Sequence, residues 1–150
     1  MIRDDIKTDL ITAMKAKEAA KVGTIRLIQA AIKNRDIEAR IGASPADDDV
    51  LISEVLQKMV KQRRESIAMF EQGNRPELAA AEAAELVVIE GFLPKQLDEA
   101  EAAAAIAAIV AETGATSVKD MGKVMTLVKE RLAGKTDMSR ASAQVKAALQ

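Results

Sequence analysis

SVKDMGKVMTLVKERLA, residues 117–133, carries apolar side chains at steps of three and four residues. This spacing places them on one face of an α-helix; they are Val118, Met121, Met125, Val128 and Leu132. Ser117 followed by Asp120 fits a capping box at the start of the helix. Gly134 stands just after its end, where glycine accepts a left-handed turn. The stretch therefore predicts an amphipathic helix with a glycine cap.

The same helical spacing recurs through the rest of the chain. Only two phenylalanines and no tryptophan or tyrosine occur, while alanine, leucine, isoleucine and charged residues dominate, which favours helices over strands. The sequence therefore predicts an all-α fold. The apolar stripes 2–14 and 25–32 are separated by a break expected near 19–23. Further helices are expected over about 50–72, 76–90, 98–112, 117–133 and 139–149.

Glycine and proline divide these helices into two groups. Gly91-Phe-Leu-Pro94 ends the fourth helix, and the helices beyond it are shorter. We expect residues 1–93 to form an N-terminal, antiparallel, four-helix bundle-like domain, because short connections favour antiparallel neighbours. Residues 94–150 are expected to form a small three-helix tail domain.

The composition excludes many kinds of site. No cysteine and no histidine occur, which removes thiolate chemistry, the commonest zinc ligand and the usual general base near neutral pH. The triplet Asp47-Asp-Asp49 lacks the spaced ligands of a calcium loop and is expected to favour the positive end of a helix. We therefore expect no catalytic constellation, no metal site and no cofactor.

The ends and the apolar stretches indicate a compartment. Asp4 and Asp5 stand where a signal peptide has a basic head and an apolar run, and no stretch approaches the length of a membrane span. A soluble, cytoplasmic protein without a membrane partner is expected.

Gly134-Lys-Thr136 has the look of the end of a phosphate-binding P-loop. Such a loop needs a glycine five positions before the Gly-Lys pair and a preceding strand, whereas Lys129 stands there and the preceding element is a predicted helix. We expect a turn between the last two helices instead.

Gly122 lies inside the predicted helix, where glycine costs about 1 kcal/mol relative to alanine. Either another helix packs closely against it, or its backbone comes near a ligand. Close packing is the commoner cause, so we expect it here.

Charge is distributed unevenly along the chain. Formal net charge is -1, but residues 119–150 hold seven bases and three acids. A shorter basic cluster lies in residues 57–64, and residues 76–101 are strongly acidic. Within the acidic segment, Glu82 and Glu85 are expected to lie on a solvated helix face. The C-terminal third is therefore the part with local attraction for an anionic partner.

Three stretches together resemble the GatB/YqeY family. They are KMVKQRRESI (58–67), LPKQL (93–97) and the segment 114–137, which contains DMGKVM and ends in GKTD. The resemblance covers nearly the whole chain in the same order and is closest to free-standing, bacterial YqeY-like proteins. Such proteins are similar to the C-terminal helical and tail regions of the B subunit of the tRNA-dependent amidotransferase.

The resemblance implies an association with tRNA. In the amidotransferase, which converts mischarged glutamyl- or aspartyl-tRNA to the amide form, the tail is associated with tRNA and a separate domain performs the chemistry. A family label of carbon–nitrogen ligase with glutamine as amide donor has no candidate residues in this chain. The resemblance therefore implies an accessory protein rather than an autonomous enzyme.

Our leading hypothesis is a helical RNA-associated accessory protein whose tail domain contacts phosphate. The candidate contacts are Lys119, Lys123, Lys129, Lys135, Arg140 and Lys146. A secondary basic patch comprises Lys58, Lys61, Arg63 and Arg64. With almost no aromatic side chains to stack on bases, recognition would be of shape and backbone.

Two alternatives remain. The chain is a protein-interaction module if the long third helix or the acidic fourth helix docks on another subunit, for which an exposed apolar stripe would be the sign. It is an amidotransferase-like protein if a partner subunit completes its activity.

Overall fold

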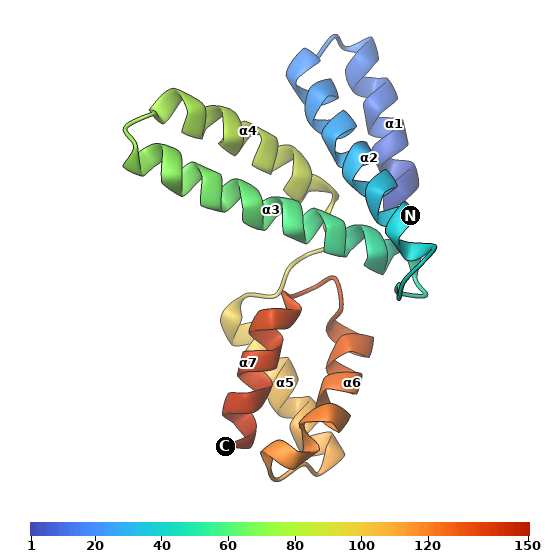
Figure 1. Cartoon of the computed structure of the whole chain (residues 1–150), viewed down its shortest axis with the longest axis vertical. Helices are drawn as coiled ribbons and strands as arrows, with labels where there is room; N and C mark the ends of the chain where they lie inside the picture. Colours follow the sequence, from blue (N-terminus) through green and yellow to red (C-terminus); the bar gives the residue numbers. More distant parts are fainter. The chain divides into compact units, whose positions relative to one another are not determined.

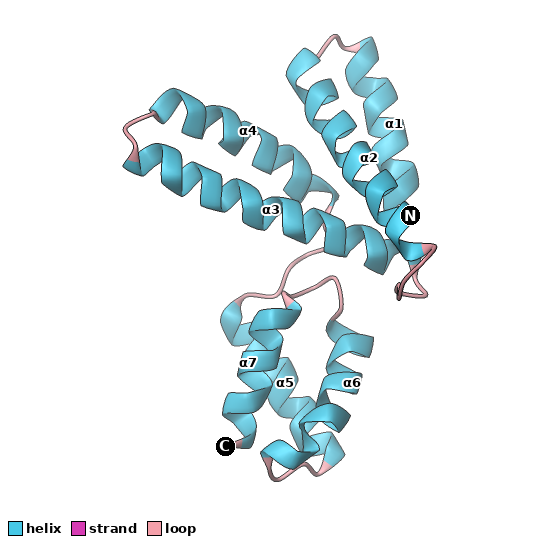
Figure 2. Ribbon diagram, viewed as in Figure 1, coloured by secondary structure: helices cyan, strands magenta, loops and turns pink.

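The computed structural model describes residues 1–150 and confirms the all-α fold. Seven α-helices and one short 3-10 helix, η1, account for the regular structure, and no β-strand is present (Figures 1 and 2). The chain divides into two compact units, residues 1–93 and residues 94–150. Each unit has its own hydrophobic core.

The first unit consists of two helical hairpins. Within each hairpin the two helices lie side by side and antiparallel (Figure 1). The helices are α1 (Ile2–Lys15), α2 (Ala19–Ala39), α3 (Asp48–Gln72) and α4 (Pro76–Phe92). Each contributes large aliphatic side chains to one core, and burying each of them stabilises the fold by roughly 1.5–3 kcal/mol. The fully buried side chains are Ile6, Ile25, Ile28, Ile52, Leu56 and Ile89.

The first hairpin turn is shorter than expected and lies earlier. The break predicted near residues 19–23 is wrong, because α1 ends at Lys15 and α2 begins at Ala19. Lys17 makes the turn in a left-handed conformation with φ 59°. Gly23 lies inside α2, where an added Cβ would meet nothing within 4 Å. A single helical glycine therefore did not mark a break.

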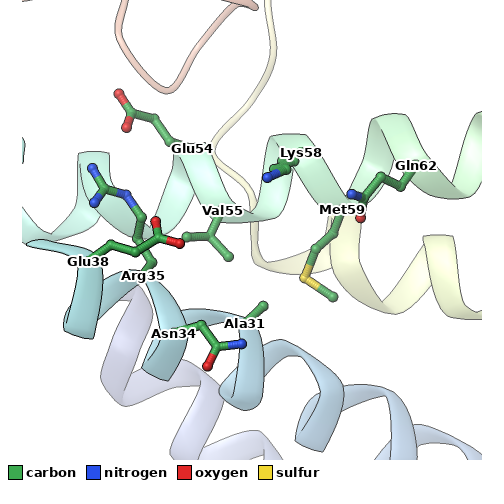
Figure 3. A pocket seen from close by; sticks show the side chains of 9 residues that line it. All are labelled: Ala31, Asn34, Arg35, Glu38, Glu54, Val55, Lys58, Met59 and Gln62. Atoms are coloured by element: carbon green, nitrogen blue, oxygen red, sulfur yellow. The ribbon is translucent and has the colours of Figure 1, made fainter.

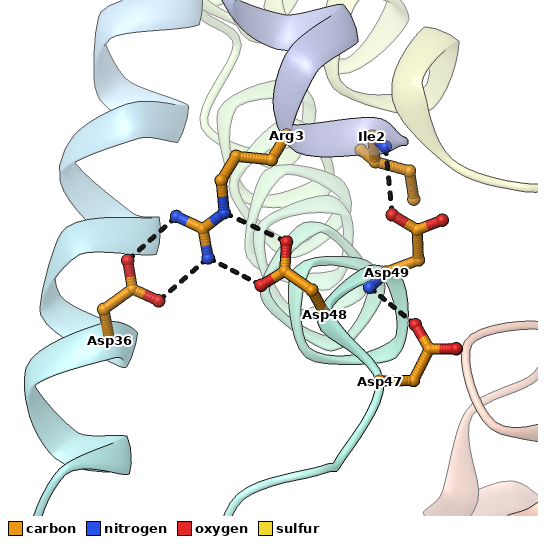
Figure 4. A network of polar contacts seen from close by, with 6 residues as sticks. All are labelled: Ile2, Arg3, Asp36, Asp47, Asp48 and Asp49. Carbon is orange, nitrogen blue, oxygen red and sulfur yellow. Dashed lines mark hydrogen bonds and ion pairs between the residues drawn. The ribbon is translucent and has the colours of Figure 1, made fainter.

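The aspartate triplet stands at the start of α3, as the sequence predicts. The Asp47 carboxylate accepts a hydrogen bond from the Asp49 backbone N–H at 2.8 Å and so caps the helix. The Asp49 carboxylate accepts a hydrogen bond from the Ile2 backbone N–H at 3.0 Å, which ties the start of α1 to the start of α3 (Figure 4).

Arg3 joins three helices through two carboxylates (Figure 4). Its guanidinium donates to both Asp36 oxygens at 2.9 and 3.0 Å, and to both Asp48 oxygens at 3.0 and 2.8 Å. These hydrogen bonds hold the pKa of Asp36 and the pKa of Asp48 below their ordinary value and raise the pKa of Arg3. Charge-assisted, two-pronged contacts of this kind fix the helix ends in position.

The second unit has three α-helices and one short 3-10 helix. The α-helices are α5 (Glu99–Thr113), α6 (Met121–Leu132) and α7 (Met138–Leu149), and the 3-10 helix η1 (Val118–Asp120) directly precedes α6. Aliphatic side chains from α5, α6 and α7 form its core. The fully or nearly fully buried ones are Ile106, Ile109, Val124, Val128, Ala141 and Val145.

The capping box predicted at Ser117 is wrong. The Ser117 side chain makes no cap hydrogen bond, and residues 118–120 form η1, so that α6 begins only at Met121. The Asp120 carboxylate instead accepts a hydrogen bond from the Thr116 backbone N–H at 3.1 Å. The apolar spacing therefore predicted the helical face, while the tighter 3-10 turn displaced the start.

The Gly-Lys-Thr stretch forms the turn between α6 and α7. Gly134 follows the end of α6 with φ 80°, which confirms the prediction of a left-handed glycine there. The turn is fastened to the segment before α5, because the Leu97 N–H donates to the Lys135 carbonyl at 2.8 Å and the Gln96 amide donates to the Gly134 carbonyl at 2.7 Å. The carbonyls of Gly134 and Lys135 are therefore hydrogen-bonded within the protein.

Candidate functional site

The six predicted phosphate contacts are all exposed, and they come from four parts of the second unit. Lys119 lies on η1, Lys123 and Lys129 lie on α6, and Lys135 lies in the turn. The remaining two, Arg140 and Lys146, lie on α7. None of the five lysines in this set forms an ion pair, although the Lys123 ammonium donates to the Thr113 carbonyl at 3.5 Å.

Two of these lysines share one face of the η1–α6 segment. Val124, Val128 and Leu132 point into the core, so residues about half a turn away face solvent. Lys119 and Lys123, four residues apart, lie on that solvent face. Lys129 leaves α6 about a quarter of a turn away from them. Of the six predicted phosphate contacts, Lys119 and Lys123 are therefore the two that lie on the same helix face; they are called the lysine pair below.

Arg140 is partly used within the protein. Its guanidinium donates to the Leu97 carbonyl at 3.3 Å and to the Thr136 hydroxyl at 3.4 Å. Thr136 itself is only 1% exposed, so its hydroxyl cannot serve an outside ligand as a P-loop threonine would. Arg140 therefore supports the α6–α7 turn as well as adding charge.

Gly122 corrects the expectation of close helix packing. It is exposed, and a Cβ added to it would meet nothing within 4 Å. Its carbonyl accepts a hydrogen bond from the Thr126 hydroxyl at 2.9 Å. No neighbouring helix explains the glycine, but open space alone does not indicate a ligand, because the helical Gly23 and Gly91 are equally open.

Acids of the second unit lie within the lysine-bearing segment as well as on α5: Asp120 directly follows Lys119, and Glu130 directly follows Lys129. Residues 94–150 hold eight bases and seven acids, and three of the acids, Asp98, Glu99 and Glu101, stand at the start of α5. Glu112 is paired with Arg131, whose hydrogen bonds lower the pKa of Glu112. The balance of the unit is thus close to neutral, and the basic character is local to η1, α6 and α7.

The secondary basic patch is divided by ion pairs within the α3–α4 hairpin. Arg63 pairs with Glu85 at 2.8 Å and with Glu82 at 3.3 Å, while Arg64 pairs with Glu90 at 2.9 Å. The side chains of Glu82 and Glu85 are 26% and 34% exposed, so the face predicted to be solvated is only partly so, because both carboxylates face Arg63 of α3. The acidic fourth helix therefore neutralises the arginines of the third.

Lys58, in turn, lines a groove between α2 and α3 with a volume of about 440 Å³ (Figure 3). The buried Val55 and Met59 also line the groove. The groove carries charges of both signs, since Arg35, Glu38, Glu54 and Lys58 all line it. A groove of mixed charge has no general preference for phosphate.

Neither a metal site nor a membrane span is indicated. No group of three or more acidic side chains could hold a metal ion. No single helix is long and apolar enough to cross a membrane; α5 and the η1–α6 segment meet the criterion only as a pair bent by 93°, and both helices bury one face in the core.

These features define a class of all-α protein with two helical units and a lysine-bearing helix in the second. The chain belongs to the YqeY-like family, because the family model described as Yqey-like protein matches residues 3–149.

Fungal relatives share this similarity. Each is named altered inheritance of mitochondria protein 41, mitochondrial. The protein from Eremothecium gossypii is 39% identical over 88 residues, which are 59% of this chain and 46% of the relative. The one from Clavispora lusitaniae is 39% identical over 97 residues, 63% of this chain and 54% of the relative.

A longer match is found in Pyrenophora tritici-repentis, whose protein is 32% identical over 133 residues, 84% of this chain and 70% of the relative. The chain spans about half the length of the first two relatives. The similarity therefore gives no information about the parts of those relatives that lie outside the matched residues.

Sequence reasoning missed the Arg3 cluster and the pairing of the secondary patch. Arg3 lies 33 and 45 residues from its partners, a separation that no local pattern reports. The α3–α4 pairing had a usable signal, because bases on one helix of a predicted hairpin were followed by acids on the next.

Proposed function

We propose that this protein is a helical accessory protein that associates with tRNA through its C-terminal unit. The observation that carries the proposal is the set of exposed lysines without ion pairs on η1, α6, α7 and the turn. Charges of this kind contact phosphates and give affinity with little reading of base sequence.

Ion pairs within the chain involve arginines rather than lysines. Arg3, Arg63, Arg64 and Arg131 are all held by carboxylates of the chain itself. The lysines of the second unit have no such carboxylate partners, a property that they share with the lysines of the first unit, so the excess of bases in residues 119–150 is what favours this part of the chain as a phosphate-binding surface.

The resemblance to the amidotransferase B subunit adds support from a different direction. In that enzyme the tail is the tRNA-associated part, and its counterpart in this chain is the lysine-bearing unit. A partner-dependent carbon–nitrogen ligase activity would draw on the partner for chemistry, because this chain has neither histidine nor cysteine.

The proposed partner is compatible with either of two compartments. The sequence predicts a cytoplasmic, bacterial protein, whereas the fungal relatives are mitochondrial by name. Bacterial cytoplasm and mitochondria both contain tRNA, so the proposed binding of tRNA by the lysines is possible in both compartments.

A protein-interaction role is the second candidate, and Val87 on α4 is the observation in its favour. Its side chain is 72% exposed, whereas Leu78, nine residues earlier and 41% exposed, lies on the opposite side of the helix. An exposed apolar side chain on a helix is one anchor that a docking partner could cover. Changing Val87→Lys would weaken such docking and leave tRNA binding intact.

The test of the tRNA proposal is the affinity of the purified full chain for unfractionated tRNA across a salt series. We expect measurable binding at low salt, a steep loss as salt rises, and weaker binding when Lys119, Lys123 and Lys135 are changed to glutamate. Absence of binding at low salt would remove the proposal.

A further inference from the structure

Gly122 occupies a helical position that alanine would fill better. Glycine there destabilises a helix by up to about 1 kcal/mol relative to alanine. The space around it is open, since an added Cβ would meet nothing within 4 Å. Packing inside the second unit therefore gives no reason for the missing side chain.

The residues around Gly122 give its surface a definite chemistry. Lys119 precedes it by three residues and Lys123 follows it directly, both exposed and without ion pairs. Thr126, one turn further on, is exposed and donates its hydroxyl hydrogen to the Gly122 carbonyl at 2.9 Å. The result is one helical residue without a side chain flanked by two cations, with Asp120 directly after Lys119 and with the Lys123 ammonium donating to the Thr113 carbonyl at 3.5 Å.

A surface of this shape and charge suits a narrow anionic chain. Without a Cβ, a ligand can approach the helix backbone more closely at Gly122 than at its neighbours. The flanking ammonium groups favour phosphate, and a phosphodiester strand carries a phosphate at regular short intervals.

The same unit is poorly suited to unpaired bases. Both phenylalanines, Phe70 and Phe92, lie in the first unit, and residues 94–150 contain no aromatic side chain. Single-stranded nucleic acid is held largely by stacking on such side chains, whereas a duplex is held by its backbone and shape.

We propose that the solvent face of the η1–α6 segment, formed by Lys119, Gly122, Lys123 and Thr126, is contacted by the sugar–phosphate backbone of double-helical RNA, with Gly122 at the point of closest approach. This inference rests on the proposed tRNA association and narrows it to one face. Lys135 lies in the α6–α7 turn, and Arg140 and Lys146 lie on α7, so these three residues are not part of this face.

The experiment compares added methyl groups at two exposed helical glycines in the full chain. Gly122→Ala is the test, and Gly23→Ala on α2 is the matched control, since an added Cβ meets nothing at either position. Both substitutions are expected to shift the midpoint of chemical denaturation to a higher denaturant concentration. The probe is a blunt RNA duplex of about 20 base pairs.

We expect Gly122→Ala to weaken duplex binding by about fivefold and Gly122→Leu to weaken it further, with Gly23→Ala unchanged. Loss of affinity together with a gain in stability is the signature of close ligand approach. If Gly122→Ala binds the duplex as tightly as the unchanged protein while Lys119→Glu/Lys123→Glu binds weakly, the inference is wrong and the proposed function stands.

Other results also decide the question. If neither the unchanged protein nor any variant binds RNA at low salt, the proposed function itself fails. A loss of stability in Gly122→Ala would place the steric requirement inside the protein and overturn the inference. Tighter binding to a single-stranded RNA of the same length, or equal binding to a DNA duplex, would contradict the assignment to double-helical RNA.

Discussion

Arg3 grips Asp48 with two parallel hydrogen bonds, Nε to Oδ2 at 3.0 Å and Nη2 to Oδ1 at 2.8 Å, and so joins the first turn of α1 to the first turn of α3. The other edge of the same guanidinium holds Asp36 of α2. One side chain thus connects three of the four helices of the first unit, which makes it the place where charge matters most to that fold.

Removing this charge should destabilise the first unit. Arg3→Met keeps an apolar stem and leaves two carboxylates facing each other without a cation. We expect the free energy of unfolding to fall by about 1–2 kcal/mol in chemical denaturation, a range set by the partial exposure of all three side chains. Arg26→Met, at an exposed arginine without an ion pair, should change it by less than about 0.5 kcal/mol. Equal effects of the two changes would show that the cluster contributes nothing.

Acid should act on the same cluster. Hydrogen bonds from Arg3 lower the pKa of Asp36 and of Asp48 below 3.8, the value of an ordinary aspartate. A carboxyl with a lowered folded pKa stabilises the fold above its unfolded pKa, and this contribution is lost as pH falls through the folded pKa. Stability should therefore decline below about pH 4 in the unchanged protein, and this part of the decline should be absent in Arg3→Met. Parallel pH curves for both proteins would contradict the assignment.

The turn between α6 and α7 should depend on glycine. Gly134 has φ 80°, a left-handed conformation that side chains with a Cβ adopt at a cost of roughly 1–2 kcal/mol. Gly134→Ala should therefore destabilise the second unit by about that amount in chemical denaturation, whereas Gly23→Ala in α2 should be neutral or stabilising. A Gly134→Ala protein as stable as the unchanged one would rule out a conformational requirement at this turn.

The arginines of the secondary basic patch should matter little to RNA, whereas its exposed lysines, Lys58 and Lys61, form no ion pair. Arg64 is already paired with Glu90, so its charge is compensated by the chain. Reversal by Arg64→Glu should change tRNA affinity by less than about twofold, while the same reversal at Lys119 should weaken it by about fivefold or more. Filter binding or fluorescence anisotropy at low salt would compare the two directly. An equal loss in both variants would move the interface to include α3.

The local sequence pattern was sufficient to predict where the helices lie, but not which residues contact one another between helices. Helix ends were predictable where glycine or proline stood, as at Gly73–Pro76 and Gly91–Pro94, because these residues act through their own backbone. The turn at Lys17 could not be predicted in this way. Lysine rarely adopts a left-handed conformation, so its residue type gives no signal for the turn.

For the candidate site too, some features could be predicted from the sequence and others could not. Exposure of Lys119 and Lys123 followed from the helical period, because the opposite face had to be buried. The use of Arg140 inside the fold, and the open space at Gly122, depended on which helices meet in three dimensions. Hydrogen bonds between segments such as Leu97 and Arg140, 43 residues apart, lie beyond any local pattern.

The most direct test of the central claim is the salt dependence of tRNA binding by the full chain and by its Lys119→Glu/Lys123→Glu/Lys135→Glu variant. Affinity for unfractionated tRNA would be measured from about 50 to about 200 mM salt. We predict a linear fall of log affinity with log salt in the unchanged protein. In the variant, binding should be at least about tenfold weaker at low salt, and the slope should be shallower by about one for each phosphate that the protein no longer neutralises. Equal affinities and equal slopes for the two proteins, or no binding by either at low salt, would contradict the proposal that this lysine-bearing unit associates with tRNA.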